Sequence, residues 1–380
     1  MWVRMDLQLR GKRAVVTGST AGIGLAIAID LAREGATVVV NGRTQGRVDA
    51  ALTRIRGEVR EARVEGVAAD LGSAGGAQAV AARASDTDIL VNNVGIFESV
   101  PFEQIDDASW LRLFETNVLS GVRLSRHYFP RMLQQGWGRI LFISSESALQ
   151  IPSEMIHYGV TKTAQLALAR GLAELTAGTQ VTVNSVLAGP TRSEGVGTFV
   201  EGLARQQRKD AGQVEREFFR RMRPSSLLQR FAEPAEVAHM VAFLASPLAS
   251  ATNGAALRVD GGVGARSSRD YRALAVRHPD AARWLPAPRP WAWVSDSATL
   301  RHGGLSRSRT GRWPAAVSPG RCRPEISGSS APIRVPPAPS ALARQWQGVA
   351  SRAAHEPERT TTSWQSKDSS PPMTYCGTRS

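Results

Sequence analysis

Between Lys12 and Asp260 the apolar residues follow two alternating patterns. Short runs rich in β-branched residues predict strands, and longer stretches with helical spacing separate them. The strand-like runs are 14–17, 37–40, 66–69, 88–91, 139–143, 181–186 and 256–259, and the helical stretches include 23–33, 107–135, 158–176 and 234–244. This alternation is typical of βαβ units. We therefore predict an α/β fold with a doubly wound parallel sheet of about seven strands and helices on both faces.

The chain changes character near Arg266. Of the 21 prolines 14 follow that residue, as do six of the nine tryptophans and both cysteines, Cys322 and Cys376. A segment so rich in Pro, Ser and Arg cannot bury enough apolar surface to offset its conformational entropy. We therefore expect a short N-terminal extension (1–5), one folded domain (6–266) and a disordered, basic, low-complexity tail (267–380). The scattered tryptophans lead to the hypothesis that the tail arises from a read-through or a shifted reading frame.

The net charge of +14 comes mostly from the tail. Residues 267–380 hold 17 Lys and Arg against 7 Asp and Glu, so the folded domain is near +4. A nucleic-acid-binding or membrane-binding function is therefore not expected for the domain. The first 266 residues lack cysteine, which excludes a disulfide framework and a thiolate metal site there, and we expect no metal. No apolar stretch reaches the roughly 18 residues of a membrane span, so we expect a cytoplasmic protein.

A glycine-rich turn follows the first predicted strand and opens the first helix. Its glycines allow a tight turn and a close approach of the backbone to a pyrophosphate, and the helix N-terminus favours an anion. The glycine triplet by itself is a weak signal, but its position between strand and helix favours nucleotide binding. The expected contacts are Gly18, Ser19, Thr20, Gly22, Ile23 and Gly24.

The end of the second predicted strand indicates which nucleotide binds. Enzymes that use NAD usually place a carboxylate there, on the ribose 2′-hydroxyl. This chain has Asn41, Gly42, Arg43 and Thr44 instead. Arg43 offers a planar fork that suits a 2′-phosphate, and Asn41 and Thr44 are neutral donors nearby. We therefore predict NADP(H) as the cofactor.

Several further motifs, in this order and spacing, make residues 6–265 resemble the short-chain dehydrogenase/reductase (SDR) family, close to its β-ketoacyl-ACP reductase branch. After the glycine turn the matching elements are Asp70-Leu71, Asn92-Asn93-Val94-Gly95, Asn117, Ser145, Tyr158-Gly159-Val160-Thr161-Lys162, the segment 184–193 and the closing segment 253–262. The resemblance implies a Rossmann-type fold. It also implies that Asp70 fixes the adenine, that Asn92, Asn93 and Gly95 support the adenosine ribose, and that Thr191 and Ser193 contact the nicotinamide amide and the pyrophosphate. The usual Pro-Gly after the sixth strand is replaced by Ala188-Gly189-Pro190, which departs from the family pattern.

Tyr158 and Lys162 lie four residues apart, so they share one face of a helix. An ammonium one turn away, together with the positive nicotinamide, favours the phenolate and lowers the pKa of Tyr158. Tyr158 then serves as proton donor or acceptor, and Ser145 hydrogen-bonds the same substrate oxygen. The serine is assigned by family spacing, since Ser144 and Ser147 are neighbours, and His157 is not expected to act as a base. The resemblance implies that Asn117 joins a water-mediated proton relay to Lys162.

The charged, helix-prone stretch 193–230 is a candidate substrate lid because it follows the sixth strand. Its apolar residues suit a moderately hydrophobic substrate, and its arginines suit an acidic carrier protein or a CoA thioester, so a 3-oxoacyl thioester is the favoured substrate.

The resemblance implies a homotetramer or dimer. The alternative function is a redox-sensing regulator that binds NADP without turnover, and the complete set of catalytic residues argues against it. The apolar residues of the candidate lid, 193–230, are Phe199, Val200, Leu203, Phe218, Phe219 and Met222.

Overall fold

The computed structural model describes residues 5–193, 196–197, 200–201, 204–205 and 208–264. The expected tail (267–380), most of the N-terminal extension and parts of the expected lid, including Phe199 and Leu203, lie outside these residues. Within the described part, no helix is both long enough and apolar enough to cross a membrane.

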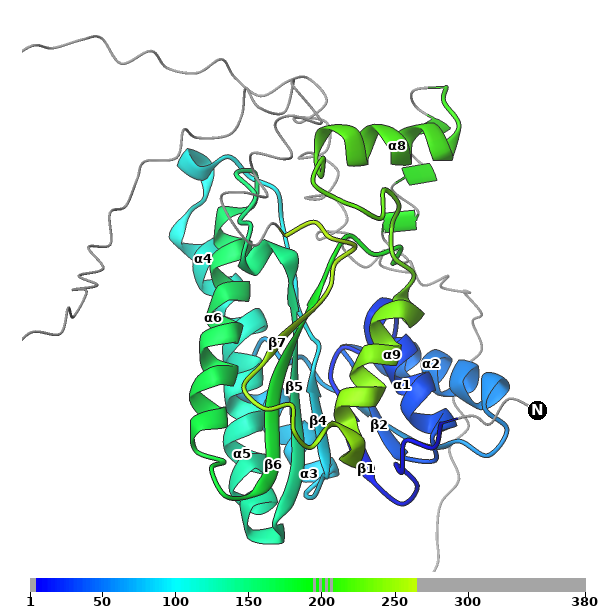
Figure 1. Cartoon of the computed structure of the whole chain (residues 1–380), viewed down its shortest axis with the longest axis vertical. Helices are drawn as coiled ribbons and strands as arrows, with labels where there is room; N and C mark the ends of the chain where they lie inside the picture. The colour runs from blue at the N-terminus through cyan, green and yellow to red at the C-terminus, as the bar shows by residue number, and fades with distance from the viewer. Residues whose placement is uncertain (1–4, 194–195, 198–199, 202–203, 206–207, 265–380) are drawn as a thin grey trace, which may run out of the picture.

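The described residues form one parallel sheet of seven strands in the order β3-β2-β1-β4-β5-β6-β7, which confirms the predicted Rossmann-type topology (Figure 1). The order reverses between β1 and β4, where doubly wound sheets open a crevice for ligands. The strands are β1 (Arg13–Val16), β2 (Thr37–Gly42), β3 (Arg63–Ala68), β4 (Ile89–Asn92), β5 (Trp137–Ser145), β6 (Gln180–Ala188) and β7 (Ala256–Val259).

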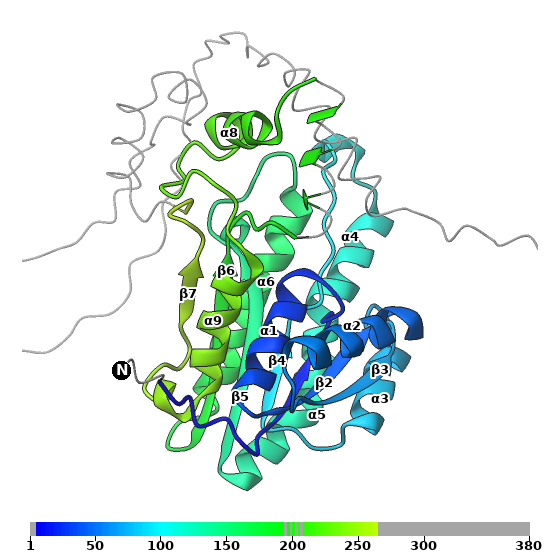
Figure 2. The same ribbon diagram turned by 90° about the vertical axis from the view of Figure 1, so that its right-hand side faces the viewer.

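Helices cover both faces of the sheet, and each face has its own apolar core (Figures 1 and 2). On one face α1 and α9 contact each other beside α2, because small and branched residues along α1 and α9 pack closely. The first layer consists of α1 (Gly22–Arg33), α2 (Gln45–Glu58) and α9 (Pro234–Ala245). The second layer consists of α3 (Ala74–Arg83), α4 (Asp107–Phe114), α5 (Ser120–Gln135) and α6 (Ile156–Glu174).

The register of β5 places Ser145 beyond its neighbour β4. Asn92, the last residue of β4, pairs with Phe142, and β5 continues to Ser145, opposite Ala188 of β6. Ser145 therefore stands at the carboxyl edge of the sheet, the edge where ligands bind in this architecture.

The helix expected over 107–135 is interrupted. A π-helical turn, Glu115–Leu119, separates α4 from α5 and contains Asn117. Such turns insert an extra residue into the helical ladder and often mark functional sites. Asn117 is thereby brought into contact with the loop after β4 and with α6.

Helix α8 (Ala211–Arg221) lies beyond the carboxyl ends of the strands (Figure 2). Its first turn is fixed by a capping box between Asp210 and Gln213. Val214 and Phe219 on its buried side pack with Val200 and Phe231. The expectation that Val200 and Phe219 offer apolar surface to a substrate is therefore wrong, because these side chains form a small core of their own.

Candidate active site

The turn between β1 and α1 has the geometry of a phosphate cradle. Gly18 and Gly22 adopt positive φ angles of 59° and 55°. A Cβ at Gly24 would lie 2.4 Å from the Gly18 carbonyl oxygen, so only glycine fits there. The N-cap residue of α1, Ala21, makes no side-chain cap hydrogen bond. The first N–H groups of α1 thus face the turn without competition from a capping side chain, as an anion site requires.

Side chains beneath the turn hold it in shape. Asn93 Nδ2 donates to the carbonyl oxygens of Thr17 and Gly18 at 2.9 and 3.0 Å. Asn41 Oδ1 accepts from Gly18 N at 3.2 Å, and its Nδ2 donates to the carbonyls of residues 67 and 69. The buried Ser19 hydroxyl donates to the Val16 carbonyl at 2.6 Å. Asn41 is therefore not the free donor expected beside a 2′-phosphate, and Ser19 supports the turn from within because its hydroxyl is already bonded.

Arg43 is exposed directly after β2, on the side of the glycine turn. Gly42 before it is closely packed, since a Cβ there would lie 2.4 Å from Thr20 Cγ2. Asp70, after β3, is also exposed, and its carboxylate accepts from Gly72 N at 3.0 Å. These ends of β2 and β3 lie side by side at the carboxyl edge of the sheet, with Arg43 and Asp70 exposed there.

Ser145 and Tyr158 are brought together by the end of β5 and the start of α6. The Ser145 hydroxyl lies close enough to Tyr158 to lower the pKa of its phenol. Ser144 points the other way and donates to the Lys162 carbonyl at 2.9 Å, while the Ser147 N–H donates to Ser145 Oγ at 3.1 Å. Alternation along the strand thus separates the two adjacent serines, and only Ser145 faces the tyrosine.

Lys162 lies one helical turn after Tyr158, with Nζ 5.7 Å from the centre of the tyrosine ring. The ammonium donates to the Ile143 carbonyl at 2.9 Å and to Gln165 Oε1 at 3.3 Å. A Cβ at Gly95 would lie 3.3 Å from Lys162 Nζ, so glycine leaves room for the lysine end. The lysine is therefore fixed on three sides beside the tyrosine.

Asn117 ties three elements together. Its Oδ1 accepts from Ile96 N at 2.8 Å, and its Nδ2 donates to the Ile96 carbonyl and to Thr161 Oγ1 at 2.9 and 3.0 Å. Its main-chain carbonyl accepts from Gln165 Nε2 at 2.6 Å. Gln165 thus connects Asn117 to Lys162, a role that sequence motifs did not reveal. The sequence shows only a glutamine three residues after Lys162, on the same helical face.

Burial within the protein shifts the pKa values of both Lys162 and Tyr158. Burial lowers the pKa of Lys162 to about 8, because the charged form loses hydration. Burial also raises the pKa of Tyr158 above its usual value, and the charge of Glu146 raises it further, while Ser145 and Arg223 oppose this. The expectation that Lys162 lowers the tyrosine pKa is therefore not met by the protein alone.

Two buried charge clusters flank the Tyr158 region, and neither was recognised in the sequence. In the first, Arg223 pairs with Glu146 and Glu154 at 3.1 and 3.3 Å. In the second, Glu98 accepts from His157 at 3.0 Å and from Arg112 at 2.6 Å. Burial raises the pKa of Glu98, but these two hydrogen bonds hold the pKa below its usual value. His157 faces Glu98, in line with the prediction that it is not the base.

Of the remaining predicted contacts, one lies at the glycine turn and two are buried in the interior. Ser193 approaches the glycine turn, because a Cβ at Gly22 would lie 3.4 Å from Ser193 Cβ. Thr191 is buried, and its hydroxyl donates to the Gly189 carbonyl at 2.9 Å. Asn92 is also buried, and its Nδ2 lies 3.4 Å from Ser125 Oγ on α5. Asn92 thus packs the sheet against α5, while Ser193 lies against the glycine turn.

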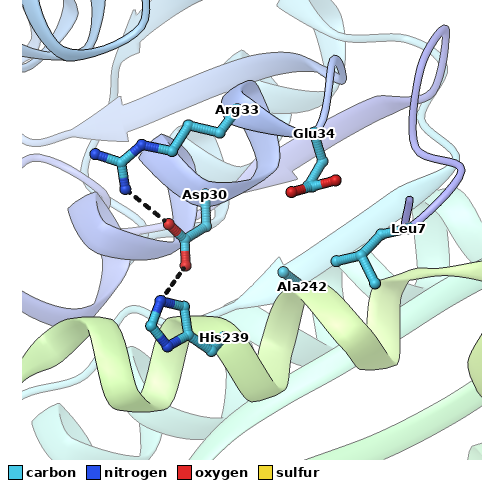
Figure 3. A pocket seen from close by; sticks show the side chains of 6 residues that line it. All are labelled: Leu7, Asp30, Arg33, Glu34, His239 and Ala242. Carbon is cyan, nitrogen blue, oxygen red and sulfur yellow. Dashed lines mark hydrogen bonds and ion pairs between the residues drawn. The ribbon is translucent and has the colours of Figure 1, made fainter. Parts of the chain in front are cut away.

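A polar surface pocket of about 420 Å³ lies elsewhere, between α1 and α9 (Figure 3). Asp30 forms ion pairs there with Arg33 at 3.1 Å and with His239 at 3.6 Å. Because α1 starts at the carboxyl edge of the sheet, these residues near its C-terminus lie at the opposite edge. The pocket is therefore separate from the Ser145–Tyr158 region.

The chain is similar to known oxidoreductases over most of the described residues. A family profile described as Enoyl-(Acyl carrier protein) reductase matches residues 18–264. The uncharacterized oxidoreductase YvaG of Bacillus subtilis (strain 168) is 47% identical over 259 residues, covering 68% of this chain and 98% of that protein. The 3-oxoacyl-acyl-carrier-protein reductase FabG of Aquifex aeolicus (strain VF5) is 30% identical over 263 residues, covering 68% of this chain and 100% of that protein. The crystal structure of L-sorbose reductase from Gluconobacter frateurii, complexed with NADPH and L-sorbose, matches with a TM-score of 0.65 at 31% identity, covering 69% of this chain and 100% of that one.

Proposed function

Because the chain belongs to the short-chain dehydrogenase/reductase family of oxidoreductases, we propose that it is an NADP(H)-dependent enzyme that reduces a carbonyl or oxidises a secondary alcohol. The observation that carries this proposal is that Ser145 and Tyr158 come together at the carboxyl edge of the sheet, with Lys162 one turn behind the tyrosine. Two hydroxyls at the carboxyl edge of the sheet, near a phosphate cradle, suit a reaction at a carbonyl oxygen.

The residues at the carboxyl edge of the sheet fit a dinucleotide. The glycine turn leaves a space that a Cβ would fill, and α1 presents its uncapped N-terminus to that space. Arg43 supports the choice of NADP(H), because an exposed guanidinium at the end of β2 can pair with a 2′-phosphate. The relative crystallised with NADPH supports the same choice. We assign the outer contacts to Thr20, Gly22, Ile23, Arg43, Asp70 and Ser193, and a supporting role to Gly18, Ser19, Gly24, Asn92, Asn93, Gly95 and Thr191.

The chain's own residues move the proton. Bound NADPH supplies the hydride, and its oxidised form carries a positive charge that favours the tyrosinate. Tyr158 Oη gives its proton to the substrate oxygen during reduction and takes it back during oxidation, while Ser145 stabilises the developing charge on that oxygen. Lys162 lies one helical turn behind the tyrosine, where the Ile143 carbonyl and Gln165 fix its ammonium group. Asn117 fixes the loop after β4 and the start of α6 around this group.

We infer a 3-oxoacyl thioester as the substrate class, with residues 193–230 as its lid. The similarity to the reductase FabG supports the thioester. Helix α8, beyond the carboxyl edge of the sheet, supports it too, because an exposed basic surface attracts an acidic carrier or the phosphates of CoA. The exposed arginines of α8 are Arg216, Arg220 and Arg221.

The direct test is a substrate panel with the full chain. Acetoacetyl-CoA, a diketone, a steroid ketone and L-sorbose are each supplied with NADPH or NADH, and nucleotide absorbance is followed. We expect acetoacetyl-CoA to be reduced with NADPH. Tight NADPH binding without turnover of any compound would overturn the enzyme proposal and favour the NADP-binding regulator.

We also propose a cytoplasmic homo-oligomer, a tetramer or dimer. Strand β7 is the last in the sheet order, so its outer edge has no neighbouring strand within the described residues. Such an edge is available for packing of a second subunit. Light scattering of the purified chain tests the assembly, and fractionation of the cells that produce it tests the location.

A further inference from the structure

Next to Ser145, the structure buries an ion pair that the proposed proton transfer does not use. Glu146 directly follows Ser145 in the chain, and its side chain is 6% exposed. Arg223, from the segment after α8, is 10% exposed. Buried charges of this kind are costly unless they are paired and hydrogen-bonded. A buried ion pair one residue from the proposed catalytic serine is therefore a candidate contributor to the reaction.

The two carboxylate oxygens of Glu146 have different partners. Oε2 accepts the hydrogen bond of the Ser145 hydroxyl, and Oε1 accepts from Arg223 Nε at 3.1 Å. Arg223 Nη1 donates to Glu154 at 3.3 Å and to the Met222 carbonyl at 2.8 Å. A continuous chain of contacts thus runs from the segment after α8 to the serine that faces Tyr158.

This arrangement fixes the direction of the Ser145 hydroxyl. A hydroxyl has one proton and two lone pairs. The proton of Ser145 points to Glu146, and a lone pair receives the Ser147 N–H at 3.1 Å. Because Ser145 has a single proton, donating it to the substrate oxygen, as the proposed function requires, means turning it away from Glu146. The carboxylate therefore holds the serine hydroxyl in place until the substrate oxygen takes over its hydrogen bond.

We propose that Glu146 and Arg223 are positioning residues for the reaction: Glu146 orients the Ser145 hydroxyl, and Arg223 holds Glu146 in place from the segment after α8. This inference rests on the proposed function, in which Ser145 and Tyr158 flank the substrate oxygen. The pair also connects the segment after α8 to the chemistry, because Arg223 binds the carboxylate that accepts the Ser145 hydrogen bond.

Charge balance gives the proposal a measurable consequence. The charged groups around Glu146 are Arg223 from the segment after α8 and Glu154 from the loop before α6, with Lys162 further along α6. The charge of Glu146 raises the pKa of Tyr158 and that of Arg223 lowers it, in addition to the larger effect of burial. Without Arg223 the negative charge is uncompensated, so Tyr158 holds its proton more tightly and donates it more slowly.

The first experiment does not depend on turnover. Of the four tyrosines in the chain, Tyr158 is assigned in a spectrum of ring-labelled tyrosine by comparison with Tyr158→Phe. We expect Arg223→Gln and Glu146→Gln each to shift the Tyr158 signal. Arg230→Gln is the matched control, because Arg230 lies in the same segment and pairs with Glu236 on the surface. An unchanged Tyr158 signal in both folded variants would overturn the proposal.

The second experiment uses acetoacetyl-CoA and NADPH with the full chain. Arg223→Gln should lower kcat by about tenfold or more, the effect of losing a charged hydrogen bond, with little change in KM and with the alkaline limb of the pH profile moved upward. Adding Glu146→Gln should restore part of kcat, because the uncompensated charge is gone. Arg223→Lys keeps the charge and should retain more activity, which covers the case that Arg223→Gln fails to fold.

The results of these two experiments distinguish the positioning role of Glu146 and Arg223 from the proposed substrate. A double variant no faster than Arg223→Gln, or a stability loss with kcat and the pH profile unchanged, would reduce Arg223 to a structural residue and overturn the inference. If the wild-type chain fails to turn over acetoacetyl-CoA, the proposed substrate is wrong, and the tyrosine spectra still decide whether Glu146 and Arg223 act on Tyr158.

Discussion

Gln165 Oε1 accepts a hydrogen bond from Lys162 Nζ at 3.3 Å, and the other end of the same amide donates to the Asn117 carbonyl. The residue lies on α6, one turn beyond the lysine, and its side chain is buried. The expected water-mediated path from Asn117 to Lys162 is thus accompanied by a direct side-chain bridge. An amide at this position fixes the lysine but does not exchange protons readily, so we assign Gln165 a positioning role.

Gln165→Leu tests this bridge. The change leaves the Asn117 carbonyl without its side-chain donor and removes one of the two acceptors of the lysine, so we expect kcat to fall by about 10-fold to 100-fold, as for a hydrogen bond to a charged group. Gln135→Leu, at the exposed end of α5, is the control and should retain full activity. Wild-type kinetics for Gln165→Leu would show that the bridge is dispensable.

Tyr158→Phe tests the proton donor. The change removes one hydroxyl and keeps the ring, which contacts Phe97 edge-to-face at 6.0 Å. We expect kcat to fall by about 10²-fold to 10⁴-fold, the usual contribution of a general acid. NADPH affinity, measured by fluorescence titration, should be nearly unchanged. Activity within tenfold of wild type would mean that another group donates the proton.

Arg43→Ala tests cofactor choice. Wild type should prefer NADPH, and the variant should lose about 1.5–3 kcal/mol of NADPH binding while NADH binding changes little, because only NADPH carries the 2′-phosphate. A carboxylate placed at residue 42 is a poor route to NADH, since its Cβ would meet Thr20. Arg43→Asp is the better switch, and its kcat/KM with NADH should exceed that with NADPH. Equal kcat/KM for both nucleotides in wild type would contradict the assignment.

Asp30→Asn tests the pocket of Figure 3 by its pH dependence. Burial raises the pKa of Asp30 above 3.8, although His239 and Arg33 oppose this. Ionised Asp30 is therefore less favourable in the folded chain than in the unfolded one, and stability is lost as the pH rises above 3.8 through the folded pKa. We expect the amide variant to have the higher Tm at pH 7 and the difference to vanish toward pH 3.8. A lower Tm at pH 7 would show that the ion pairs outweigh burial.

A shortened chain of residues 5–266 tests the domain boundary. Strand β7 is the last strand in the sheet order, and Val263, which follows it, is already buried. The core is therefore complete within the described residues. We expect the shortened chain to be oligomeric by light scattering, with turnover per site and Tm at least equal to those of the full chain. Loss of folding or of activity would show that residues 267–380 belong to the working enzyme.

The sequence by itself predicted the doubly wound parallel sheet, the phosphate cradle and the spacing of Ser145, Tyr158 and Lys162. Each of these depends on local rules, namely β-branched runs, glycines at a strand-to-helix turn, and two residues one helical turn apart. The structure confirms the fold and brings the serine and tyrosine together. Local pattern suffices here because neighbouring parallel strands bring their carboxyl ends to one edge.

Only the tertiary structure decided which polar groups are already bonded. Asn41 and Ser19 have the right chemistry for a ligand, yet both are bonded to backbone beneath the turn. The pair Glu146 and Arg223 spans 77 residues, and no local pattern predicts a contact across such a distance. Such pairings follow from the path of the whole chain, because a buried polar group takes whichever partner the packed elements bring to it. The same reason explains why the pKa of Tyr158 could not be inferred from the spacing of Lys162, since burial and a distant arginine contribute to it as well.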